Sequence, residues 1–118
     1  MHEFSVMSYL LETVEAKAQE VGAQRVLAIN LVVGERSSIV DDSMLFYFDM
    51  MTPGTLAEGA TLNMQRIPSE FYCKQCNATY HPGTDFCCPT CGAIGALTEV
   101  GSEFYIDSIE IERDDTNP

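Results

Sequence analysis

Basic side chains are scarce in this chain of 118 residues. Its 6 lysines and arginines stand against 18 aspartates and glutamates, so the net charge is −12. Nucleic acids bind proteins mainly through cations on their phosphates, and an anionic membrane surface repels an acidic protein. Long apolar runs are missing too, because the longest, Met44–Phe48, is far shorter than a membrane span or a signal-peptide core. We therefore expect a soluble, cytoplasmic protein that binds neither nucleic acid nor membrane.

Cysteine is absent from all but one short segment. All five cysteines lie between Cys73 and Cys91. A disulfide framework would spread its cysteines over the elements that it links, and a reducing cytoplasm would not keep it oxidised. Four of the five instead form two C-x-x-C pairs, Cys73–Cys76 and Cys88–Cys91. This clustering indicates a metal site.

Two segments outside the cysteines have apolar residues at helical spacing. Residues 5–21 read as an amphipathic helix that Gly22 ends. Residues 43–51 read as a second helix, with Asp41 or Asp42 as its N-terminal cap. The spacing predicts that this second helix buries Met44, Leu45, Phe48 and Met51.

Three segments alternate as strands do: residues 25–33, 60–67 and 103–113. In the third, the apolar positions change face, which predicts a bulge near Asp107–Ser108. In the first, the alternation predicts one buried face made of Leu27, Ile29, Leu31 and Val33.

These elements predict an α+β fold. Residues 1–68 and 100–118 would form a small two-helix, three-stranded sheet domain. Residues 69–99 would form a zinc-ribbon-like module inserted between its second and third strands.

The cysteine module resembles a zinc ribbon with two knuckles, Cys73-Lys-Gln-Cys76 and Cys88-Pro-Thr-Cys91-Gly92. The residue after a knuckle often takes a positive φ, which explains Gly92 and suits Asn77. Four thiolates around Zn²⁺ make a closed tetrahedral site with no position for substrate. The sequence therefore predicts one structural zinc, which supplies most of the module's folding free energy.

Two residues of the module leave alternatives open. Cys88 keeps the C-x-x-C spacing and the following proline, so we assign it as the ligand and interpret Cys87 as a spare thiol. His81 lies between the knuckles. A solvated loop histidine is its commoner role, but it could replace a cysteine or bind a second metal.

The amino terminus carries a second metal-binding pattern, Met1-His2-Glu3. The α-amine, the backbone nitrogen of His2 and its imidazole Nδ1 can close fused five- and six-membered chelate rings. Nitrogen donors in a plane suit Ni(II) or Cu(II). Taken alone, the pattern is also that of an ordinary solvated terminus.

Taken together and in order, several segments resemble the HypA/HybF family of hydrogenase nickel-incorporation accessory proteins. The segments are Met1-His2-Glu3, Gly34-Glu35-Arg36-Ser37, Val40-Asp41, Ala57-Glu58-Gly59-Ala60 and the two C-x-x-C pairs. The resemblance implies a nickel metallochaperone that helps insert nickel into the large subunit of [NiFe]-hydrogenase. The partners that it implies are a nickel-insertion GTPase of the HypB type and, for some members, urease maturation proteins.

The resemblance also implies which residues bind metal. His2 and the Met1 α-amine would bind nickel, with Glu3 and Asp41 as further candidates and Asp42 as the alternative to Asp41. The structural zinc would be bound by Cys73, Cys76, Cys88 and Cys91. We find no nucleophile–base pair, phosphate-binding glycine loop or catalytic-metal motif, and expect no enzymatic activity.

Two other functions fit part of the sequence. A rubredoxin-like electron carrier would hold iron in the four cysteines, and its colour would distinguish it. A zinc-ribbon module that binds another protein is the second, and capture of its partners would distinguish it. The electron carrier would leave Met1-His2-Glu3 and the whole α/β domain unexplained.

Overall fold

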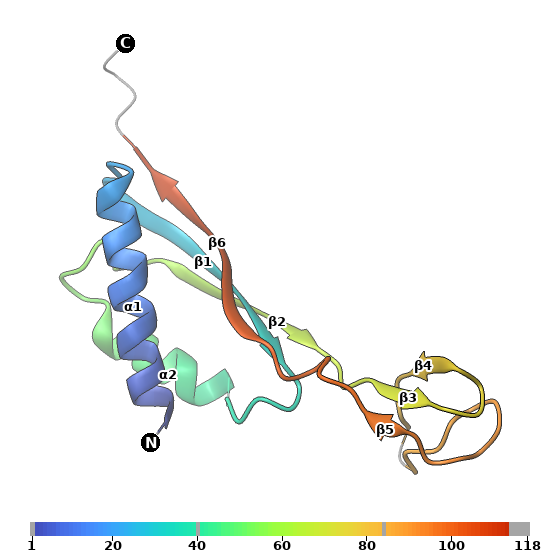
Figure 1. Cartoon of the computed structure of the whole chain (residues 1–118). Coiled ribbons are helices and arrows are strands. Elements are labelled where there is room, and N and C mark those ends of the chain that lie inside the picture. Colours follow the sequence, from blue (N-terminus) through green and yellow to red (C-terminus); the bar gives the residue numbers. More distant parts are fainter. Residues whose placement is uncertain (1, 40, 84, 114–118) are drawn as a thin grey trace. The chain divides into compact units, whose positions relative to one another are not determined.

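The computed structural model describes residues 2–39, 41–83 and 85–113 (Figure 1). The strands form two sheets of three, with the orders β2-β1-β6 and β4-β3-β5. No helix in the described residues is long and apolar enough to cross a membrane. The predicted α+β fold is confirmed, with these elements in chain order: α1 (His2–Glu20), β1 (Arg25–Gly34), α2 (Asp41–Met51), β2 (Thr61–Ile67), β3 (Phe71–Cys73), β4 (Ala78–Tyr80), β5 (Ala96–Leu97) and β6 (Phe104–Glu112).

The chain divides into two compact units. The first comprises residues 1–31, 38–65 and 105–118, and the second comprises residues 32–37 and 66–104. In the first unit, α1 and α2 pack against each other on one side of the sheet β2-β1-β6 (Figure 1). Because one face of each helix is apolar, burying that face drives the packing. The helices bury Met7, Leu10, Val14, Ala18, Met44 and Phe48.

The buried faces differ from the predicted ones at two leucines. Leu27 is 39% exposed, whereas Val26 and Ala28 on either side of it are buried. The face of β1 shifts where Ala28 and Ile29 are both buried, so the prediction that Leu27 shares the core face is wrong.

Leu45 is 40% exposed, because this short helix turns a single face to the core. Its predicted burial is wrong as well, and Met51, which the same spacing predicts to be buried, is only half-buried. The predicted change of face in β6 is confirmed, since Asp107 and Ser108 are both exposed between half-buried isoleucines.

In the second unit, the turn that follows β1 is tied to both connections of the cysteine module. The backbone N–H of Glu35 donates to Ile67 O at 2.7 Å, and that of Arg36 donates to Gly101 O at 2.7 Å. The Arg36 guanidinium also donates to Thr98 O at 2.6 Å. These bonds satisfy backbone groups on two segments that are far apart in sequence.

The Glu35 carboxylate strengthens this turn. Its Oε1 accepts a hydrogen bond from Ser69 N–H at 3.2 Å. The Ser69 backbone N–H and hydroxyl hold the pKa of Glu35 below its usual value, because both stabilise the carboxylate. The turn at residues 34–36 is therefore a structural joint of the second unit.

Gly34 is required at this joint because two backbones meet there. A Cβ on Gly34 would lie 2.1 Å from Gly101 O and 2.6 Å from Glu103 N. Neither atom belongs to a side chain that could move aside.

We predict that Gly34→Ala lowers the free energy of unfolding by about 1–3 kcal/mol or more, as measured by urea titration. The matched control is Gly83→Ala, where a Cβ meets nothing within 4 Å and the change should stay within about 0.5 kcal/mol. Equal stability of the two variants would contradict the close approach.

Candidate metal centre

Two turns in the second unit bring four cysteines together. Cys73 ends β3, and the turn that holds Cys76 closes at Asn77, whose φ is 55°. The second turn closes at Gly92, whose φ is 78° and whose N–H donates to Cys88 O at 2.8 Å. Both residues predicted to suit a positive φ have one. The ligand atoms of the four cysteines all lie within 4.8 Å of one another: Cys73, Cys76, Cys88 and Cys91.

The distances between the sulfurs fit a tetrahedral metal ion. Metal–sulfur bonds of about 2.3 Å place the sulfurs of a regular tetrahedron about 3.8 Å apart. Here the Sγ atoms of Cys73 and Cys91 lie 3.5 Å apart, and those of Cys76 and Cys88 lie 3.8 Å apart. The four cysteines could therefore hold a metal ion with little rearrangement, and a full set of four thiolates leaves no open position for a substrate.

The thiols of this cluster do not ionise alike. The backbone N–H groups of Cys91 and Thr90 stabilise the Cys88 thiolate and lower its pKa to about 6. Hydrogen bonds with the Cys91 and Cys88 sulfurs raise the pKa of Cys76 to about 12. The Cys88 thiol therefore loses its proton more readily than the Cys76 thiol does. Gathering four thiolates requires a cation that replaces the remaining protons.

A tyrosine links the two halves of the module. The Tyr80 hydroxyl donates to Phe86 O and accepts from Gly95 N–H, both at 2.9 Å. The Tyr80 ring packs beside Phe71, with ring centroids 5.8 Å apart, and it is buried together with Cys73 and Cys88. Gly95 leaves room for this arrangement, since a Cβ there would lie 2.4 Å from Tyr72 O. Tyr80 of β4 thus bonds to the segments on both sides of the second knuckle.

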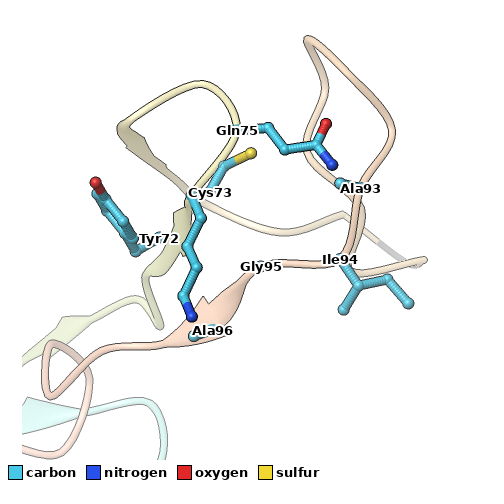
Figure 2. Close-up of a pocket in the computed structure, with 8 residues that line it drawn as sticks. Tyr72, Cys73, Gln75, Ala93, Ile94, Gly95 and Ala96 are labelled. Atoms are coloured by element: carbon cyan, nitrogen blue, oxygen red, sulfur yellow. The ribbon is translucent and has the colours of Figure 1, made fainter.

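A pocket of about 330 Å³ opens beside the first knuckle. Figure 2 shows the Gln75 side chain extending toward Ala93 across this pocket, with Tyr72 on the other side of Cys73. Cys73 itself is buried, so the pocket reaches the cluster only at its edge.

Cys87 and His81 lie outside the four-sulfur group. The Cys87 thiol donates to Asp85 O at 3.5 Å, and its residue forms an isolated bridge with Ile94. The Nδ1 atom of His81 lies 2.9 Å from Ser69 O, so Nδ1 carries the proton that bonds this carbonyl. Within the described part of the chain, the four cysteines form the single group of three or more histidine, cysteine, aspartate or glutamate residues that could hold a metal.

Two of the predicted nickel ligands, Glu3 and Asp41, lie at the beginnings of the two helices. Met1 and the side chain of His2 are outside the described residues, as is Val40. Glu3 is half-buried in the first turn of α1, and Asp41 is half-buried at the first residue of α2. The first turn of α1 packs beside α2, since the rings of Phe4 and Tyr47 meet edge to face with centroids 5.5 Å apart.

The sequence is similar to one family over nearly its whole length. The family described as "Hydrogenase/urease nickel incorporation, metallochaperone, hypA" matches residues 1–111. The hydrogenase maturation factor HypA of Dehalococcoides mccartyi is 42% identical over 113 residues, which cover 95% of each chain. The HypA of Geobacter sulfurreducens is 37% identical over 113 residues, which cover 95% of this chain and 100% of the relative.

Two solved structures have a similar fold. The solution structure of the Ni metallochaperone HypA from Helicobacter pylori has a TM-score of 0.62 at 24% identity, covering 95% of this chain and 98% of that one. A second HypA solution structure has a TM-score of 0.68 at 25% identity, covering 94% and 96% of the two chains. The arrangement of two helices and two small sheets is thus a fold already seen in such proteins.

The geometry predicts different roles for the two adjacent cysteines. Cys88→Ser should lose the bound metal, because it removes one of the four sulfurs within 4.8 Å of one another. Cys87→Ser should keep one metal ion per chain, because the Cys87 thiol bonds to Asp85 O. Elemental analysis of both purified variants after gel filtration tests this. Metal loss in Cys87→Ser with retention in Cys88→Ser would reverse the assignment.

Proposed function

Because the chain belongs to the HypA family of hydrogenase/urease nickel-incorporation metallochaperones, we propose that it carries Ni(II) at its amino terminus and delivers it during hydrogenase maturation. One observation carries this proposal: the family match runs from residue 1 through both C-x-x-C pairs to residue 111. A hydrogenase maturation factor must bind nickel selectively and then release it. An exposed chelate at a chain end meets that need better than a closed cage.

The nickel donors that we propose are the Met1 α-amine, the backbone nitrogen of His2 and its imidazole Nδ1. The start of a helix favours this chelate, because the first four N–H groups of a helix have no intrahelical acceptor. The backbone nitrogen of His2, the first residue of α1, could therefore release its proton to water and bind nickel in its place without breaking a helical hydrogen bond. Glu3 and Asp41 are the nearest further candidates, each in the first turn of its helix.

For the four-cysteine centre we propose a structural Zn²⁺. The sulfur spacing fits a Zn²⁺ site, and four thiolates would close it to substrates. Iron held in the same four sulfurs would make the rubredoxin-like rival, and a bare zinc ribbon would make the interaction module. Neither rival accounts for a family match that runs over residues 1–111 and so includes both helices of the first unit.

In this proposal, each unit binds a different metal. The first unit would hold the transient nickel, and the second would hold the permanent zinc. The two proposed ligand sets share no residue, so nickel can leave without disturbing the zinc-dependent fold.

The role that we assign is transport of a metal and not catalysis. The family's role in nickel incorporation implies partners in hydrogenase maturation. Within that class we propose the [NiFe]-hydrogenase large subunit as the acceptor and a GTPase of the HypB type as the coupled partner. Urease maturation proteins are further candidates.

The proposed amino-terminal chelate predicts that two changes at the terminus weaken nickel binding. Both His2→Ala and a Gly-Ser extension before Met1 should weaken Ni(II) binding at least 100-fold, because each removes one donor of the fused rings. Isothermal titration of untagged protein with Ni(II) measures the change. His81→Ala is the matched control and should bind nickel as the unaltered chain does.

Two further readouts check the same site. Zinc content should be unchanged in all of these variants. Nickel affinity should fall as the pH drops through the histidine range, because the imidazole must be neutral to coordinate. Full-strength nickel binding by the extended protein would rule out the terminal chelate.

A further inference from the structure

The first turn of α1 precedes the part of the helix that the core holds. Met7, with 0% exposed, is the first buried side chain that the structure describes along α1. Before it, Glu3 and Val6 are half-buried, and Phe4 is 46% exposed. Helix ends with few buried apolar contacts open more readily than helix centres do. The turn that would present the nickel donors therefore depends on contacts outside the core.

One such contact comes from α2, which packs against α1 (Figure 1). The Phe4 and Tyr47 rings meet edge to face, with centroids 5.5 Å apart and ring planes at 86°. This arrangement is attractive because the positive edge of one ring faces the negative π surface of the other. Tyr47 lies between Met44 and Phe48, the two buried residues of α2. The contact thus ties the first turn of α1 to a helix that is itself anchored in the core.

A hold on Phe4 acts on the backbone of His2. In a helix that begins at His2, the N–H of Val6 bonds the His2 carbonyl, and Phe4 lies inside the turn that this bond closes. The proposed chelate needs an amine, an amide nitrogen and an imidazole in one plane. Each backbone residue that nickel must fix costs free energy. A terminus that is ordered before nickel binds avoids part of that cost and binds more tightly.

We propose that Tyr47 is a positioning residue for the amino-terminal nickel chelate. Through Phe4, the Tyr47 ring keeps the first turn of α1 formed and so raises the affinity for Ni(II), while neither ring touches the metal. This inference rests on the proposed function, because it takes the nickel donors from it.

The test is a double-mutant cycle on nickel affinity. Phe4→Leu and Tyr47→Leu each remove one ring and keep an apolar side chain. Each should weaken Ni(II) binding by the untagged, zinc-loaded chain about threefold to tenfold, which is the range that one edge-to-face ring pair contributes. The double variant should bind about as well as either single variant, because the contact can be lost only once. Losses that simply add would overturn the proposal.

Two variants control for other effects on α2. Phe46 also meets the Tyr47 ring edge to face, with centroids 5.4 Å apart, but it lies on α2 itself. Phe46→Leu should therefore bind nickel within twofold of the unaltered chain. Tyr47→Phe keeps the ring and should keep full affinity. Weak binding by Tyr47→Phe would assign the effect to the hydroxyl, and a loss in Phe46→Leu equal to that in Tyr47→Leu would assign it to α2 as a whole. Either result rejects the positioning role of the ring.

Hydrogen exchange of the nickel-free protein gives a readout that does not involve the metal. The Val6 amide should exchange severalfold faster in Phe4→Leu and Tyr47→Leu, and the amide of Val14, which is buried farther along α1, should exchange as before. Phe4 is half-exposed, so Phe4→Leu carries the test even if Tyr47→Leu disturbs the fold. Unchanged exchange at Val6 would refute the proposal.

The same titrations separate this inference from the proposed function. If His2→Ala abolishes nickel binding and Tyr47→Leu binds nickel at full strength, the inference alone fails. If nickel binding survives His2→Ala, the proposed function fails, and the positioning role fails with it because there is no terminal chelate to position.

Discussion

Repulsion among four closely spaced sulfurs is the constraint on which the second unit depends. Ligand atoms within 4.8 Å of one another cannot all be thiolates without a cation among them. Beyond these sulfurs, the module's buried cluster consists of little more than Tyr80. A metal bound by these sulfurs would supply the folding free energy that so small a core lacks. The turn at residues 34–36 has its hydrogen-bond partners in 66–69 and 98–103, so we expect its bonds to depend on the same metal.

The first unit is built on the opposite principle. Its core is apolar, with Met7, Ile29 and Met44 almost wholly buried, so its stability needs no metal. A metal held at the edge of such a unit can bind and dissociate without unfolding it. In the proposed function, a permanent zinc ion stabilises the second unit, and the first unit carries nickel transiently.

Local features of this molecule could be read from the sequence, and contacts between distant segments could not. The C-x-x-C pairs and the positive φ of Gly92 follow from short-range geometry, and both appear as predicted. Alternation misplaced Leu27, because it cannot show where a strand changes its buried face. Nothing in Glu35 or Arg36 indicates that they join segments more than 30 residues away, or that Gly34 lies against Gly101. Helical spacing alone gave no reason to expect Phe46 and Tyr47 to meet Phe4 in an exposed cluster.

We propose that nickel and zinc occupy chemically separate sites. X-ray absorption at the two metal edges, on untagged protein loaded with one equivalent of each ion, tests it most directly. The zinc spectrum should show four sulfur neighbours at about 2.3 Å. The nickel spectrum should show nitrogen and oxygen neighbours and no sulfur. Sulfur scattering at the nickel edge would place nickel in the cysteine cluster and contradict the claim.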